Sequence, residues 1–309
     1  MQMKKFLLRL MAFFIVMLVL IAIGLVLPPT PRAQTSLLMG ETYKMNILKK
    51  ASKPRVIFIG GSNLSFGLDS KMIQDSLGVN PVNMAIHASI GLKYMMDKIL
   101  PQISAGDVVV VCAEYEQFND GYAYGREELL RTIFDVKTNS LNEISIKQWY
   151  HVSPFIPKYA LSKFVISEYL KSKNDEAHYL ESAFNQYGDV TSHWNLKAAT
   201  VQAFPNHLGP IDLDVIDLLS EFNAEAISRG GRVILTFPGL QATSFRNNSQ
   251  NIDTYFSVLE TSGFTLAGNP TRYIIPDSLI FDTPYHLTRE GTAIRTNLLI
   301  HDLRPLLLE

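Results

Sequence analysis

The chain has 309 residues, of which 47% are hydrophobic, and its 28 basic and 29 acidic residues leave a formal net charge of −1. Such a chain can bury a large core, and we expect one domain of ordinary size with additions. No basic stripe provides the positive surface that nucleic-acid binding requires, which excludes that class of function. The single cysteine, Cys112, lies in an apolar run, excludes an intramolecular disulfide or a cysteine-based metal cluster, and is interpreted as a small buried hydrophobe.

The N-terminal region contains an uncharged tract from Leu10 to Leu27. As a helix this tract spans about 27 Å, close to the thickness of a hydrocarbon core. It is longer than the apolar region of most cleaved signal peptides, and residues 28–33 lack a clear small-x-small cleavage site. We therefore expect a cytoplasmic tail over residues 1–9 and an uncleaved, single-pass transmembrane anchor over residues 10–27.

The basic residues around this tract predict its orientation. Lys4, Lys5 and Arg9 precede it, whereas only Arg32 follows closely. The positive-inside bias then places the N-terminus in the cytoplasm and the rest of the chain on the extracytoplasmic side, periplasmic or at the cell surface. Further basic residues at 44, 49 and 50 make the bias modest. A cleaved signal peptide would lead to the same destination.

Beyond the anchor, residues 28–54 are predicted to be a proline-started linker with one short helical stretch, followed by a domain over residues 55–309. Apolar runs predict strands at residues 55–59, 81–86, 107–112 and 232–237, and helical patterns lie at 68–77, 92–103 and 215–229, the last ended by Gly230 and Gly231. Strands that are apolar on both faces and alternate with helices are typical of a parallel sheet covered on both sides. The fold class is therefore α/β, a three-layer sandwich with a central parallel sheet.

Residues 119–209 interrupt this alternation with helical and irregular sequence that contains both tryptophans. Two interpretations remain open for this insertion. It is either a helical subdomain with its own aromatic core, or a lid or substrate wall over the carboxyl edge of the sheet, where insertions often lie.

The segment Gly60-Gly61-Ser62-Asn63, directly after the first strand, suggests either a phosphate cradle or a nucleophile. The phosphate interpretation lacks a closing Lys-Ser/Thr pair and a third glycine at the dinucleotide spacing. A nucleophilic serine at the carboxyl edge of the sheet needs only a tight turn and a base. Asn63 is interpreted as a helix cap, with a place beside the serine as the alternative.

Seven histidines are available as the base, and six of them are interpreted as exposed or packing side chains. His286 differs, because it lies in a loop before a C-terminal helix that Thr288 can cap. Asp282, four residues earlier, is close enough in a turn to orient the imidazole. Ser62, His286 and Asp282 are therefore the candidate catalytic triad. Arg295 in the last helix is interpreted as a surface or capping charge.

A serine early in the domain, in Gly60-Gly61-Ser62-Asn63, and the late pair Asp282 and His286 resemble the GDSL or SGNH hydrolase superfamily. The resemblance implies an SGNH/flavodoxin-like three-layer fold. It also implies esterase, lipase, polysaccharide deacetylase or O-acyltransferase activity. The order of elements over residues 55–309 agrees, apart from the insertion. However, three residues separate Asp282 from His286 where the family has two.

Two further family features concern the oxyanion. The segment after the second strand is expected to provide a backbone donor, from Ala88, Ser89 or Gly91. The Gly-x-Asn-Asp block that usually follows the third strand is missing, and residues 113–120 stand in its place. The side chains of Tyr115, Gln117 and Asn119 could donate instead. Glu114 and Glu116 are interpreted as ordinary loop charges, with a contact to a sugar hydroxyl as the alternative.

The expected function is that of an anchored serine acyl ester hydrolase, acting on acylated envelope polysaccharide or lipid, with no metal or organic cofactor. Two alternatives remain. One is O-acyl transfer onto a polysaccharide with the same triad. The other is a non-catalytic carbohydrate-binding or assembly module with the same fold.

Overall fold

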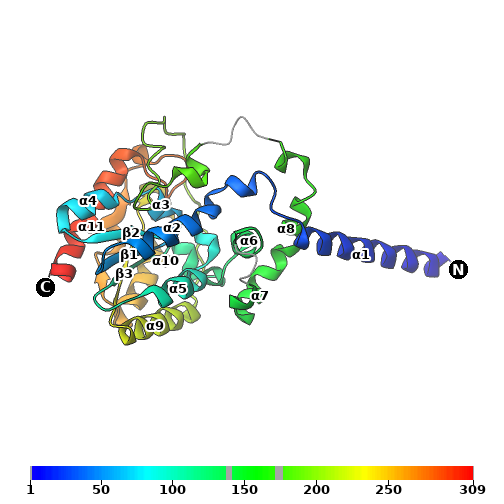
Figure 1. Cartoon of the computed structure of the whole chain (residues 1–309), viewed down its shortest axis with the longest axis horizontal. Helices are drawn as coiled ribbons and strands as arrows, with labels where there is room; N and C mark the ends of the chain where they lie inside the picture. The colour runs from blue at the N-terminus through cyan, green and yellow to red at the C-terminus, as the bar shows by residue number, and fades with distance from the viewer. Residues whose placement is uncertain (1, 137–140, 171–176, 309) are drawn as a thin grey trace.

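The computed structural model describes residues 2–136, 141–170 and 177–308. Its centre is a five-stranded sheet in the order β2-β1-β3-β4-β6, in which all neighbouring strands are parallel. The predicted α/β class is confirmed, with helices on both sides of the sheet (Figure 1). The strands of this sheet are β1 (Arg55–Gly60), β2 (Asn80–Asn83), β3 (Val108–Cys112), β4 (Arg232–Thr236) and β6 (Leu266–Ala267).

Strand β3 is the central strand and β1 is its neighbour, and every residue of both is buried. Their β-branched side chains pack well on a pleated surface that is covered on both faces, which explains their continuous apolar runs. At the start of β1, Arg55 is also buried, because its guanidinium pairs with the buried carboxylate of Asp107 at 2.5 Å.

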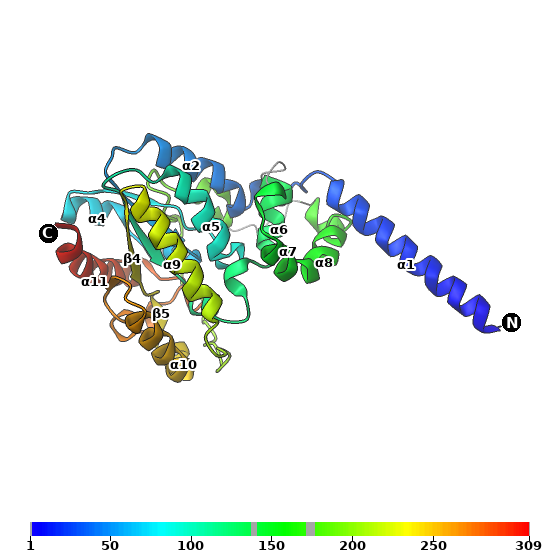
Figure 2. The same cartoon turned by 90° about the horizontal axis from the view of Figure 1, so that it is seen from below.

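Helices cover both faces of the sheet (Figure 2). The pair α4 and α11 pack on each other on one face, while α5 and α9 lie along the other. The bounds are α3 (Ser62–Ser65), α4 (Ser70–Leu77), α5 (Leu92–Ile99), α9 (Leu213–Ser228), α10 (Ala242–Thr261) and α11 (Arg289–Leu308). The start of α11 has the expected cap, because Thr288 Oγ1 accepts a hydrogen bond from the Gly291 amide at 3.2 Å.

Some predicted bounds differ from the observed ones. The second strand was expected to reach residue 86, but β2 ends at Asn83, whose Oδ1 accepts the Ala85 amide at 3.1 Å and closes a turn. Helix α4 begins at Ser70 because the Asp69 carboxylate caps it by accepting the Met72 amide. The sequence patterns did not predict β6, α10 or the small parallel pair of β5 (Leu240–Gln241) and β7 (Ile274–Ile275).

The N-terminal helix α1 (Gln2–Val26) is long and apolar enough to cross a membrane, and only Gly24 within it is buried. It projects from the α/β body (Figure 1) and contacts α8 (Ile156–Ser162) near its C-terminal end. A Cβ at Gly24 would lie 2.2 Å from the carbonyl oxygen of Ala160, so this close approach requires glycine. An exposed apolar helix of this kind fits a signal anchor or a signal sequence.

The segment between α1 and β1 is built into the folded body. Its helix α2 (Gly40–Lys50) buries Leu48 completely and packs beside α5, where Tyr94 donates hydrogen bonds to the Glu41 carboxylate at 3.1 Å. The buried Lys44 ammonium donates to the Ala85 carbonyl, and burial lowers the Lys44 pKa to about 7. Residues 28–54 therefore connect α1 to the sheet through a packed helix.

The insertion is helical and irregular, as expected, with α6 (Glu127–Arg131), α7 (Ile146–Val152) and α8 as its α-helices among the described residues. Leu129, Leu130 and Tyr159 are buried in a second hydrophobic cluster that also includes Phe66 and Leu38. The insertion thus shares one core with the end of the anchor segment and with the carboxyl edge of the sheet.

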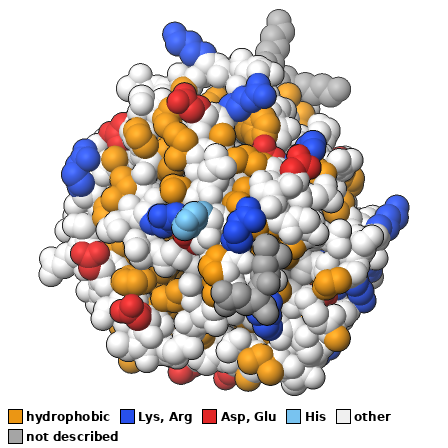
Figure 3. Space-filling model, turned by 90° about the vertical axis from the view of Figure 1, so that its left-hand side faces the viewer, with side chains coloured by type: hydrophobic (Ala, Val, Ile, Leu, Met, Phe, Trp, Pro, Cys, Tyr) orange, Lys and Arg blue, Asp and Glu red, His pale blue; other side chains and the backbone are white. Residues whose placement is uncertain are grey.

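Figure 3 shows the face of the molecule at the end opposite to α1. Basic and acidic side chains are intermixed there with apolar and neutral surface.

Candidate active site

The register of the sheet places Ser62 beside Glu114. In the parallel pair of β1 and β3, Gly60 is opposite Cys112. Ser62 and Glu114 each follow these partners by two residues, so both leave the sheet at the same point of its carboxyl edge. The strand order β2-β1-β3 makes this point a topological switch, where ligands of open α/β sheets bind.

The side chain of Glu114 contacts the start of α3 directly. Its Oε1 accepts hydrogen bonds from the Ser62 hydroxyl at 3.3 Å and from the Asn63 amide at 3.0 Å. The residue between β1 and Ser62 has to be glycine, because a Cβ at Gly61 would lie 2.3 Å from Glu114 Oε1 and 2.8 Å from the Ala88 Cβ. The Glu114 carboxyl is therefore enclosed by the backbone of residues 61–63 and by Ala88.

Burial, and to a smaller extent the negative charge of Glu116, raise the pKa of Glu114 to about 8. Hydrogen bonds from Asn63 and Ser62 oppose this shift but do not outweigh it. Glu114 is thus largely a neutral carboxylic acid at pH 7, and the interpretation as an ordinary loop charge is wrong.

The second half of the site is the turn before α11, which brings Asp282 to His286. The amide of His286 donates to Thr283 O at 3.0 Å, that of Phe281 donates to His286 O at 2.8 Å, and Ile280 is bridged to Leu287. Because the turn is closed in this way, Asp282 reaches the imidazole from four residues earlier, and its Oδ1 lies 2.8 Å from His286 Nδ1.

Tyr179 from the insertion completes this pair. Its hydroxyl donates to Asp282 Oδ2 at 2.5 Å and lies 3.2 Å from His286 Nδ1. Burial opposes ionisation of Asp282, but hydrogen bonds from His286 and Tyr179 outweigh it and hold the Asp282 pKa below its ordinary value. Asp282 is therefore an ionised acceptor that fixes the proton of the imidazole on Nδ1 and leaves Nε2 as the basic nitrogen.

Phe66 connects the two halves of the site. Its ring stacks on the His286 imidazole, and its carbonyl accepts hydrogen bonds from the Leu287 amide at 3.4 Å and the Thr292 hydroxyl at 3.3 Å. Its own amide donates to Ser62 O at 2.9 Å. The loop that begins with Ser62 is thus packed against the loop that carries His286, although 224 positions separate these two residues in the sequence.

The three expected oxyanion donors lie in the turn after β2. The Ser89 amide donates to His87 Nδ1 at 3.2 Å, and the Gly91 amide donates to Ala88 O at 2.9 Å. Both amides are therefore occupied within the turn, and Ala88 remains the candidate beside Ser62. Gly91 has a positive φ of 87°, and a Cβ there would meet the Gly125 nitrogen at 2.5 Å, so this turn requires glycine.

The side chains that were expected to replace the missing asparagine point elsewhere. Asn119 donates to the Tyr255 hydroxyl on α10 at 2.8 Å, and Gln117 donates to Ala88 O at 3.0 Å while it accepts the Glu114 amide. The Tyr115 side chain is 1% exposed, and its hydroxyl has no hydrogen-bond partner among the described residues. Of the segment after β3, it is Glu114 that contacts Ser62.

Two further histidines, His178 and His193, lie close to the loop that carries Asp282 and His286. His178 and His193 from the insertion pack against Phe281, and His193 Nε2 lies 2.9 Å from Leu287 O. Burial lowers the pKa of His193 to about 4. Among the described residues, no group of three histidine, cysteine or acidic side chains is arranged to hold a metal ion.

A buried polar cluster lies beneath Ser62. The Asn63 side-chain amide is 3.2 Å from Cys112 Sγ, and Arg295 Nη2 is 3.4 Å from the same sulfur. Arg295 is 0% exposed, so its interpretation as a surface or capping charge is wrong. Asn63 is 2% exposed and points into this cluster, where it ties the start of α3 to the end of β3.

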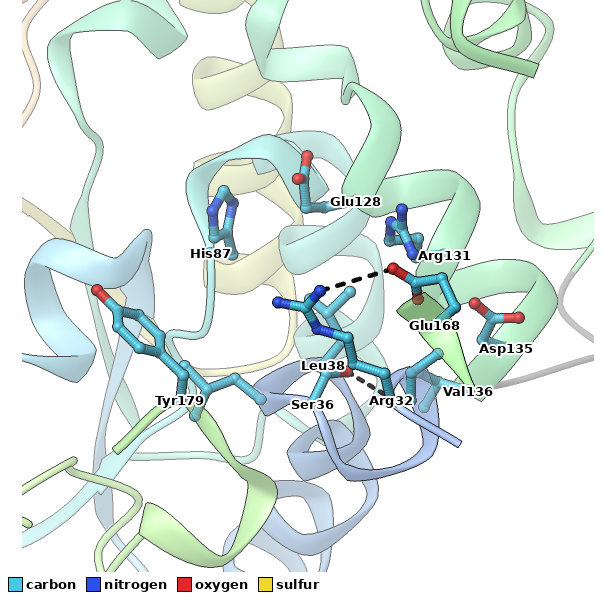
Figure 4. Close-up of a pocket in the computed structure, with 12 residues that line it drawn as sticks. Arg32, Ser36, Leu38, His87, Glu128, Arg131, Asp135, Val136, Glu168 and Tyr179 are labelled. Atoms are coloured by element: carbon cyan, nitrogen blue, oxygen red, sulfur yellow. Dashed lines mark hydrogen bonds and ion pairs between the residues drawn. The ribbon is translucent and has the colours of Figure 1, made fainter. Parts of the chain in front are cut away.

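A cavity of about 410 Å³ lies between the segment after α1, the turn after β2 and the insertion (Figure 4). Tyr179 lines this cavity and also forms the hydrogen bond to Asp282. The remaining walls come from the segment after α1, the turn after β2 and the insertion. They consist of Arg32, Ala33, Ser36, Leu37, Leu38, His87, Glu128, Arg131, Asp135, Val136 and Glu168.

Charged groups dominate the polar part of the cavity wall. Arg32 forms an ion pair with Glu168 at 3.7 Å, Arg131 with Glu127 at 2.8 Å, and Asp135 with Lys163 at 2.5 Å. Figure 4 shows His87 and Glu128 side by side along one wall, with Tyr179 at one end. The carboxylates of Glu128, Asp135 and Glu168 can accept hydrogen bonds from the hydroxyl groups of a ligand. The guanidiniums of Arg32 and Arg131 can donate hydrogen bonds to them.

Three residues of the site had not been singled out from the sequence: Glu114 as a partner of Ser62, Tyr179 and Phe66. The position of Glu114 directly after a buried strand was the available signal. Nothing in the local sequence of Tyr179 or Phe66 indicated contact with residue 286.

No protein family and no curated protein matches the chain. The structure defines an α/β protein with a five-stranded parallel sheet and an apolar N-terminal helix. At the carboxyl edge of this sheet, a serine contacts a buried glutamic acid, and Phe66 joins their loop to the loop of an aspartate–histidine pair.

Proposed function

We propose that this protein is a serine acyl ester hydrolase of the SGNH type, with Ser62 as nucleophile, His286 as base and Asp282 as the residue that orients it. The observation that carries the proposal is the Asp282–His286 hydrogen bond at 2.8 Å, held by Phe66 against the loop that begins with Ser62. Nucleophile, base and orienting carboxylate are the three roles that acyl transfer at serine requires.

In the proposed reaction, the Ser62 hydroxyl rotates from Glu114 toward His286 Nε2 and transfers its proton there as Oγ attacks the ester carbonyl. The tetrahedral intermediate expels the alcohol, which takes the proton from His286, and leaves an acyl-serine. Water, deprotonated by the same imidazole, then releases the acid and restores the Ser62 hydroxyl. Asp282 keeps its charge throughout and stabilises the imidazolium.

The cavity beside Tyr179 is a candidate substrate subsite. Its volume of about 410 Å³ is within the range of small-molecule sites, and its wall carries the carboxylates and guanidiniums described above. These groups suit the hydroxyls of a sugar, while Leu37, Leu38 and Val136 provide apolar wall, so an acylated envelope polysaccharide and a lipid ester both fit the proposed class.

The position of the cavity supports a site close to a membrane, and the basic residues before the apolar tract favour the extracytoplasmic side. Residues 32–38 form part of its wall, and they follow α1 within twelve residues. Protease added to intact cells or spheroplasts should digest the α/β domain in this orientation. Digestion only after lysis of the inner membrane would contradict it.

The experiment for the catalytic proposal is labelling with a fluorophosphonate, which reacts only with an activated serine. Wild-type protein should label, and the Ser62→Ala variant should not, while Ser65→Ala serves as a matched control from the same helix. Hydrolysis of acetylated sugars should be lost together with labelling. Equal labelling of the wild-type and Ser62→Ala proteins would refute the assignment of Ser62, and no labelling of either would favour a binding module.

A further inference from the structure

We propose that Glu114, as a neutral carboxylic acid, donates a hydrogen bond to the oxyanion in the reaction proposed for Ser62. The inference rests on that proposed function and assigns the oxyanion donor that the missing asparagine would otherwise provide. It starts from the geometry of the carboxyl, whose Oε1 accepts from the Ser62 hydroxyl at 3.3 Å and from the Asn63 amide at 3.0 Å.

The carboxyl lies beside the Ser62 hydroxyl, close to where the oxyanion would form. An ester carbonyl attacked by Ser62 develops its negative oxygen within hydrogen-bonding reach of the nucleophile and of the turn at residue 88. Glu114 and Ala88 both lie next to Gly61, whose Cβ position is 2.3 Å from Glu114 Oε1 and 2.8 Å from the Ala88 Cβ. With Oε1 engaged by Asn63, the second carboxyl oxygen is available to carry the proton.

The residues near Glu114 leave few other donors for this role. Gln117 is held by Ala88 O, and Asn119 by the Tyr255 hydroxyl. The Ser89 amide donates to His87 within its own turn. Within the part of the chain that the structure describes, Glu114 is the side chain after β3 that contacts Ser62.

The surroundings of Glu114 keep it protonated at neutral pH. The side chain is 8% exposed, and burial raises its pKa to about 8. The titratable groups that face it are Glu116 from its own turn, Cys112 from β3, Tyr122 from the insertion and Tyr285 from the loop before α11. Burial raises the pKa values of Cys112, Tyr122 and Tyr285, so these three side chains are neutral at pH 7. Of the groups named, the negative charge of Glu116 is the one that opposes ionisation of Glu114. A neutral carboxylic acid can donate to an oxyanion, whereas a carboxylate repels it.

The test compares Glu114→Gln with Glu114→Ala in the full chain, by the pH dependence of kcat for an acetyl ester. Loss of the donor in Glu114→Ala should lower kcat by about 10² to 10³. Glu114→Gln keeps an N–H donor and should stay within about tenfold of the wild type. The wild type should lose activity as the pH rises through about 8, where Glu114 ionises, and Glu114→Gln should lack this loss.

A second measurement tests the protonation of the Glu114 carboxyl through the pH dependence of the melting temperature. Because the Glu114 pKa is raised on folding, its burial stabilises the folded state at low pH and this contribution is lost as the pH rises from about 4.5 to about 8. The melting temperature of Glu114→Gln relative to wild type should therefore increase over this window. No such trend would show that Glu114 is ionised throughout.

The outcomes separate this inference from the proposed function. If wild type labels and hydrolyses but Glu114→Gln is as inactive as Glu114→Ala, the side chain acts as a base or an anion, and only the inference on Glu114 is overturned. Full activity of Glu114→Ala would also overturn it. If the wild type neither labels with a fluorophosphonate nor hydrolyses esters, both proposals are wrong.

Discussion

The ring of Phe66 stacks on the imidazole of His286, with the ring centroids 4.1 Å apart and the planes inclined by 12°. Phe66 is 1% exposed, and His286 is 4% exposed. This contact joins the first loop of the sheet to the last one, because the Phe66 amide is bonded to Ser62 and its carbonyl to Leu287. The position of His286 relative to Ser62 therefore depends on the ring and the backbone of Phe66.

Substitutions of His286 and Asp282 should separate the proposed role of the base from that of the residue that orients it. His286→Ala removes the base and is expected to lower kcat by about 10⁴ or more, whereas Asp282→Asn leaves the imidazole in place with the wrong tautomer and should cost up to about 10⁴. Initial rates on an acetylated sugar measure both. Wild-type rates in His286→Ala would exclude the mechanism.

Tyr179→Phe removes a hydroxyl that donates to Asp282 Oδ2 at 2.5 Å. A hydrogen bond to a charged group contributes about 1.5–3 kcal/mol, so we expect kcat to decrease by about tenfold to a hundredfold. The loss also weakens the stabilisation of the Asp282 carboxylate, and the Asp282 pKa should rise, as followed by NMR titration. Tyr43→Phe, which removes an exposed hydroxyl that donates to the Asn185 carbonyl, is the control.

Gly61→Ala should displace the Glu114 carboxyl, because the added Cβ would lie 2.3 Å from its Oε1. We expect kcat to decrease by about 10², similar to the loss of an oxyanion donor. In the Glu114→Ala background the same substitution should cost less, since of the close contacts only that with the Ala88 Cβ at 2.8 Å remains. Additive losses in the double variant would contradict this account. Gly209→Ala, with its nearest neighbour at 3.9 Å, is the matched control.

Ser36→Phe should fill the cavity beside Tyr179 without touching the triad. Ser36 is half-buried in the cavity wall, and its hydroxyl donates only to the nearby Ala33 carbonyl. We expect KM for an acetylated oligosaccharide to increase about tenfold or more, while a small acetyl ester is hydrolysed as before. Gln250→Phe, on the exposed face of α10, tests for a general effect of the added ring. An equal loss with both substrates would show that the cavity is not a substrate subsite.

Asp107→Asn should lower stability without affecting the chemistry. Burial opposes the charge of Asp107, but hydrogen bonds from Arg55 and Ser104 outweigh it and hold the Asp107 pKa below its ordinary value. Breaking a buried pair costs about 3–5 kcal/mol. Because a lowered pKa stabilises the fold only while Asp107 is ionised, the difference from wild type should shrink as the pH falls below about 4. Urea unfolding at pH 7 and pH 3 measures this, with the exposed Asp75→Asn as control.

The amino-acid sequence by itself determined most of the sheet and two loops of the candidate site. Its apolar runs predicted β1, β3 and β4, because strands buried on both faces rarely carry polar residues. The uncharged N-terminal tract predicted α1, and the glycines before Ser62 and the turn before Thr288 identified the two loops of the site. These features are local, since each depends on residues within one element or one turn.

Tertiary structure decided which side chains meet. Glu114 reaches Ser62 because the β1–β3 register pairs Gly60 with Cys112, and Tyr179 reaches Asp282 because the insertion packs on the last loop. Arg295 is buried, although the sequence of its helix suggested a surface or capping charge. Periodicity reports the average burial of an element, but contacts between residues separated by 50 to more than 200 positions depend on how the elements pack.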